Sequence, residues 1–176
     1  MSGNGGSALI SGGFSSDGTS GMASIESSPS GPNGVSGDIY MSSGLSEAGD
    51  SGSIVLQTGS SRNGSGGSLS FKSGSGGGLS DGGDISLTAG LTSAQGRKGG
   101  SVTIMGGEGA SAHASDGGDG GNVVLLGGEA KGESKSDNGG SITIRGGASF
   151  AGFGGSLDFI SGQSSEASSG DICKCV

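Results

Sequence analysis

The sequence predicts an all-β protein, a parallel β-solenoid of about eleven copies of one short strand motif. Two observations predict this fold. Apolar residues recur in pairs two positions apart, and glycine-flanked copies of that pattern start 15 to 21 residues apart along the chain. The pair spacing places both apolar side chains on one face of an extended strand. The recurrence indicates a repeat array, which we predict to be a single domain over residues 1–176.

Each copy reads Gly, then Ser, Asp or Asn, then apolar, variable, apolar, variable, small and Gly. In one representative copy the apolar pair is Ile142 and Ile144, whereas the alternate positions are Thr143 and Arg145. This alternation is typical of a strand that has one solvated face. The copies start near residues 6, 21, 37, 52, 67, 83, 100, 121, 140, 155 and 170.

The composition by itself favours a different interpretation. Glycine contributes 46 residues and serine a further 39, together about half of the 176 residues, and only 28% of the chain is hydrophobic. Such values are typical of flexible linkers and disordered tracts. The apolar residues, however, are arranged in pairs at a fixed position of the repeat. We therefore prefer the ordered array.

The connections between copies bear on how the predicted strands pair. Most of them have eight to ten residues, more than the two to five that join antiparallel strands in a hairpin. If one copy formed a whole coil, the connection after each strand would have to cover the apolar side chains of the strands. The segment 59–66 contains no apolar side chain, so it could not cover them. We predict two strands, about 30 residues, per coil. Three copies per coil and a β-sandwich are the alternatives, and the flanking glycines are expected to permit positive φ and close approach at the corners.

Four aspartates are candidate calcium ligands: Asp81, Asp84, Asp116 and Asp119. Each pair places carboxylate oxygens beside flexible glycines, an arrangement that calcium can use, although turn formation by aspartate explains the pattern without a metal. No other cofactor is indicated. The single histidine, His113, has no nucleophile and acid at a catalytic spacing, so we predict that the protein is not an enzyme.

The remaining reactive residues are Cys173 and Cys175. On an extended strand both would point the same way, which is a poor geometry for a bond to each other. They are therefore either unpaired thiols or an intermolecular crosslink. The two longest connections, 106–120 and 127–139, carry half of the charged residues found in connections, together with His113. They form either a binding side of the array or a tolerated surface insertion.

The net charge of -8 excludes several partners. An acidic chain with one tyrosine and no basic patch is unsuited to nucleic acid. No apolar stretch approaches the roughly 20 residues of a membrane span. The first five residues lack the basic start and apolar run of a secretory signal. For an exported protein we therefore expect that the signal was removed or that the chain is a piece of a longer one.

The run of Gly-Gly-Ser-Ile-Thr-Ile-x-Gly-Gly units between Gly37 and Gly162 resembles the Gly/Ser-rich tandem-repeat surface proteins of algae and of large microbial adhesins. The resemblance covers most of the chain and carries over no functional residue. It implies an extracellular or cell-surface fibre, wall or adhesion component. Because the array has no evident caps, we predict that it self-assembles end to end. The alternatives are a solenoid that binds a glycan or ice, and a viral or phage fibre segment.

Overall fold

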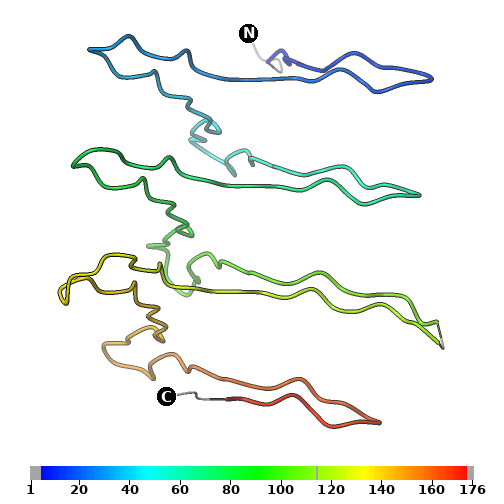
Figure 1. Ribbon diagram of the computed structural model, residues 1–176, viewed down its shortest axis with the longest axis vertical. Coiled ribbons are helices and arrows are strands. Elements are labelled where there is room, and N and C mark those ends of the chain that lie inside the picture. Colours follow the sequence, from blue (N-terminus) through cyan, green and yellow to red (C-terminus); the bar gives the residue numbers. More distant parts are fainter. Residues whose placement is uncertain (1–4, 114, 174–176) are drawn as a thin grey trace. The chain divides into compact units, whose positions relative to one another are not determined.

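The computed structural model describes residues 5–113 and 115–173, and within these ranges the chain forms neither an α-helix nor a β-strand (Figure 1). Extended segments alternate with connections that turn the chain back on itself. The chain divides into two units, Met1–Ile85 and Ser86–Val176. Their boundary lies inside the copy that starts at residue 83, so both units consist of the same kind of repeat.

The prediction of an all-β parallel β-solenoid is therefore wrong for the described residues, and the assignment of two strands per coil is wrong with it. Thirteen hydrogen bonds join backbone groups there, each at a turn or a connection, and none belongs to a ladder between neighbouring copies. A folded globular chain makes roughly one hydrogen bond per residue, about two-thirds of them between backbone groups. The physical reason is that each copy offers only two apolar side chains, and no neighbouring copy covers them.

Eight of the thirteen backbone hydrogen bonds in the described residues lie where a connection closes. The N–H of the glycine that opens one copy donates to the C=O of the glycine that closes the previous copy, at 2.7 to 3.3 Å. We call these closures glycine necks. The eight necks join Gly13 to Gly21, Gly59 to Gly67, Gly74 to Gly83, Gly90 to Gly100, Gly107 to Gly121, Gly128 to Gly140, Gly147 to Gly155 and Gly162 to Gly170.

Close approach of the two chain legs explains why glycine occupies the necks. A Cβ at Gly127 would overlap the carbonyl oxygen of Gly140, and the same holds at three equivalent positions. Where the residue before the closing glycine is larger than glycine, the opening glycine provides the space. A Cβ at Gly67 would lie 3.1 Å from the Cβ of Thr58. The small-then-glycine ending of the repeat is therefore a steric requirement of the neck.

Positive φ is not the reason for these glycines, contrary to part of the expectation from sequence. Among the described residues only Gly78 and Gly96 have φ in the left-handed region, at 64° and 70°. Both lie at the tips of connections, inside main-chain turns that close between Gly77 and Ser80 and between Ala94 and Arg97. The neck glycines thus serve close approach, whereas two tip glycines serve backbone conformation.

The least exposed residues also lie at the necks and tips. No described side chain is buried, and nine residues are half-buried. All nine are small, so the close contacts involve backbone and short side chains, not an apolar core. They are Ser15, Ser27, Ser46, Thr58, Ser73, Ala89, Gly109, Gly146 and Ser161.

Two kinds of hydrogen bond hold the tips of the connections. In five tips a serine hydroxyl accepts from the backbone N–H three residues later, at 2.9 to 3.1 Å. Such serine turns replace a backbone turn with a side-chain acceptor. In four others the backbone itself closes the turn, over residues 31–34, 77–80, 94–97 and 134–137. The serines are Ser15, Ser46, Ser61, Ser149 and Ser164.

The neck geometry predicts the effect of replacing Gly127 by valine. The added side chain meets the carbonyl oxygen of Gly140, so the bond from the Gly140 N–H to the Gly128 carbonyl, 2.8 Å long, should be lost. Hydrogen exchange of the Gly140 amide, followed by NMR, should then accelerate by roughly fivefold, as expected for loss of about 1 kcal/mol.

The matched control is Gly128→Ala, because a Cβ at Gly128 meets nothing within 4 Å. This variant should leave the exchange rate of the Gly140 amide within about twofold of the wild type. Equal acceleration in both variants would show that the neck does not depend on close approach at residue 127.

Candidate functional site

The apolar pairs of the copies are the most regular chemical feature that the described residues present. In one copy, Ile54 and Leu56 are 54% and 53% exposed, whereas Val55 between them is 75% exposed. The pair residues are also the less exposed ones in the copy that starts near residue 121, where Val123 and Leu125 are less exposed than Val124 and Leu126. The pair therefore occupies one side of each copy, and that side remains open to solvent.

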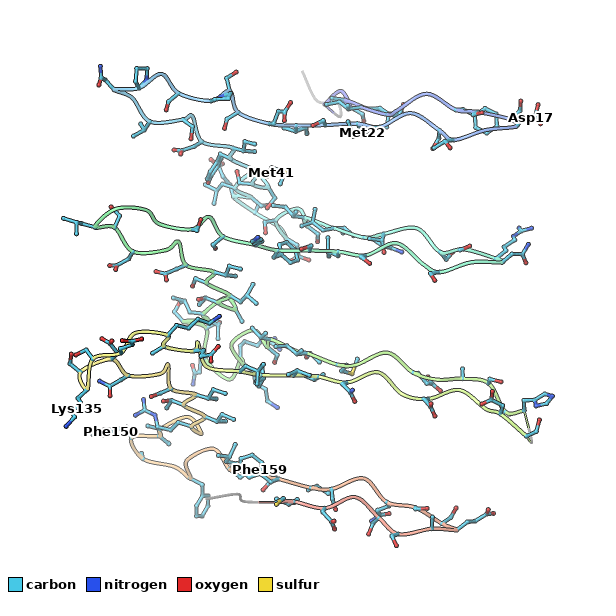
Figure 2. All side chains as sticks on the ribbon, in the orientation of Figure 1. Asp17, Met22, Met41, Lys135, Phe150 and Phe159 are labelled. Carbon is cyan, nitrogen blue, oxygen red and sulfur yellow. The ribbon has the colours of Figure 1, made fainter. Side chains whose placement is uncertain are left out.

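Side chains project away from the backbone along both units, as Figure 2 shows, and they do not gather into a packed cluster in either unit. The labelled Asp17 and Lys135 lie at the tips of the connections 13–21 and 128–140. Most of the charged residues lie in the connections, and the apolar pairs lie in the copies between them. The surface of each unit alternates between these two kinds of segment.

The four aspartates predicted as calcium ligands are divided between the two units, with Asp81 and Asp84 in the first and Asp116 and Asp119 in the second. Asp81, Asp84, Asp116 and Asp119 are all exposed. Among the residues that the structure describes, no three His, Cys, Asp or Glu side chains are placed to hold one metal ion. The backbone carbonyl of Asp84 instead accepts a hydrogen bond of 2.9 Å from the Ser73 hydroxyl. These residues thus remain candidates from sequence, with no convergent geometry to support them.

The two long connections contain local hydrogen bonds and charges on the surface. In the connection 107–121, Nδ1 of His113 lies 3.0 Å from Oγ of Ser115 and 3.4 Å from its backbone nitrogen. In the connection 128–140, Nζ of Lys131 lies 4.0 Å from Oε2 of Glu129, with both side chains largely exposed. Such exposed ion pairs contribute little to stability. Neither connection forms a pocket with its neighbours in the described part of the chain.

The predicted cysteine crosslink can be located only in part. Cys173 is exposed, and Cys175 lies outside the described residues. The described chain has no helix of the length and apolar character that crossing a bilayer requires. A comparison with family models, with curated proteins and with solved structures finds no match to this chain.

The serine turns at the connection tips were not singled out from the sequence. The five serine acceptors lie inside the connections, each two residues after the glycine that closes a copy. The signal that identifies four of them is a Ser-x-x-Gly spacing, as in Ser61 and Gly64. In a chain with 46 glycines this spacing occurs often by chance, which is why it did not stand out.

The exposed positions of the aspartates predict how the chain responds to calcium. A calcium titration followed by isothermal calorimetry should give no saturable binding tighter than about millimolar, because two exposed carboxylates form only a weak site. Removing two of them in the variant Asp116→Asn/Asp119→Asn should leave the titration unchanged. Saturable binding in the wild type that this variant abolishes would instead place a calcium site in the connection 107–121.

Proposed function

We propose that this chain is a structural protein that associates with copies of itself, as a component of an extracellular fibre, wall or adhesive surface. One observation carries the proposal. The described chain presents an apolar pair in nearly every copy, and it buries none of these side chains on its own. Burial of apolar surface is the main favourable term in protein association. A chain that displays this surface at a regular interval is suited to repeated contacts with like chains.

The composition supports a structural role in a second way. Glycine and serine make up about half of the sequence, and the eight glycine necks give their connections a defined start and end without a core. A repeat of this kind can be lengthened or shortened by whole copies without disturbing its neighbours. The proposal keeps the expectation of a non-catalytic role and of a location at the cell surface or outside the cell.

Sedimentation velocity over a wide range of protein concentration tests the proposal. The sedimentation coefficient should rise with concentration, and negative-stain images of the largest species should show elongated particles. Added salt should strengthen the association, because it screens repulsion between chains that each carry a net charge of -8. A single slow species at every concentration and salt level would refute self-association.

A further inference from the structure

We infer that the apolar pairs are the surface on which further copies of this chain lie alongside it, copy against copy, along the length of the array. This inference rests on the proposed self-association and specifies which residues make the contact. It differs from association of the chain ends alone. The pairs that define the surface are Ile39/Met41, Ile54/Leu56, Leu69/Phe71, Ile85/Leu87, Val102/Ile104, Val123/Leu125, Ile142/Ile144 and Leu157/Phe159.

The accessible area of the chain favours contacts with many copies over contacts at the chain ends alone. The chain exposes 17592 Å². A folded monomer of 16.3 kDa exposes roughly 7,500 Å², and its unfolded chain about 24,000 Å². The chain is therefore closer to the unfolded value, with an excess of roughly 10,000 Å² over a compact fold. Contacts limited to the two ends of an array would cover only a small part of that excess.

A globular partner is poorly matched to this surface. A specific protein interface of standard size buries about 1,200 to 2,000 Å² in total. Such a partner would cover a few copies and leave the others exposed. The occupant must instead present apolar pairs over a comparable length and at a comparable interval. Another copy of this chain carries the same apolar pairs at the same intervals, and identical chains commonly associate through symmetric contacts.

The glycine necks keep the copies equivalent despite the unequal connections. Between successive necks, every copy from residue 67 to residue 162 runs eight residues from glycine to glycine. The connections range from the short 59–67 to the long 107–121, and each is closed off at its own neck. A neighbouring chain thus meets segments of one length with a pair in each, whatever the length of the intervening connection.

The placement of charge permits this approach between two acidic chains. Eleven of the 16 acidic residues lie in the connections, and the other five lie within copies but never at a pair position. The pairs can therefore come into contact without burying a carboxylate, which would be costly. The five acidic residues in the copies are Glu26, Asp38, Asp84, Asp158 and Asp171.

Substitutions within one copy test the assignment. In the full chain, Ile54→Asp/Leu56→Asp places two carboxylates on the pair side, whereas Val55→Asp places one on the opposite, more exposed side. Sedimentation velocity should show association of the pair variant weakened by at least about tenfold, because two aliphatic side chains that the contact would bury are replaced by carboxylates. The single variant Leu56→Asp should also weaken association more than Val55→Asp.

The same comparison in the second unit uses Val123→Asp/Leu125→Asp against Val124→Asp/Leu126→Asp, which carry equal added charge. Exchange of the Gly67 and Gly140 amides reports whether the necks remain intact in every variant. If wild type associates and the two sides are equally sensitive in both units, the pair surface is wrong while self-association stands. If wild type does not associate at all, the proposed function fails, and this inference fails with it.

Discussion

The hydrogen bond across each glycine neck is the interaction on which the order of this chain depends. It joins the two legs of a connection at a place where backbone approaches backbone closely, and glycine makes that approach sterically possible. In the described residues, most of the half-buried positions lie at these necks and at the connection tips, and none belongs to an apolar pair. The chain is thus organised by local closures, each of which holds a connection of different length without help from a core.

This organisation separates two tasks that a globular protein combines. The necks and the serine turns fix the local path of the chain through backbone hydrogen bonds. The apolar pairs contribute little to that path, since they remain about half exposed or more, and their burial is left for contacts with other molecules. A net hydrogen bond contributes only about 1 kcal/mol, so local closures alone leave the extended segments between them weakly held. Association along those segments would supply the missing stabilisation.

The repeat could be read from the sequence because its signal is periodic and chemically simple. Glycine, a small polar residue and two apolar residues at fixed spacing appear in one copy after another, as in the copies that start near residues 52 and 140. The sequence pattern did not determine whether the extended segments pair into a sheet. The alternation of apolar and polar residues with period two indicates an extended segment with one apolar face and one polar face. Pairing into a sheet requires a second segment, and the pattern does not specify where that segment lies. The candidate calcium residues remain a prediction for a related reason, because the sequence places aspartates beside glycines but does not specify which carboxylates converge in space.

The sequence by itself determined the copies, their starting points, the apolar pair in each and the acidity of the connections. Only the tertiary structure decided that the closing and opening glycines meet, that Thr58 faces Gly67 across a neck, and that the pair of Ile54 and Leu56 stays open to solvent. The physical reason is that spacing along a chain fixes which side of a segment a residue occupies. It does not fix what lies opposite, since that depends on which backbone legs approach one another and how closely glycine lets them do so.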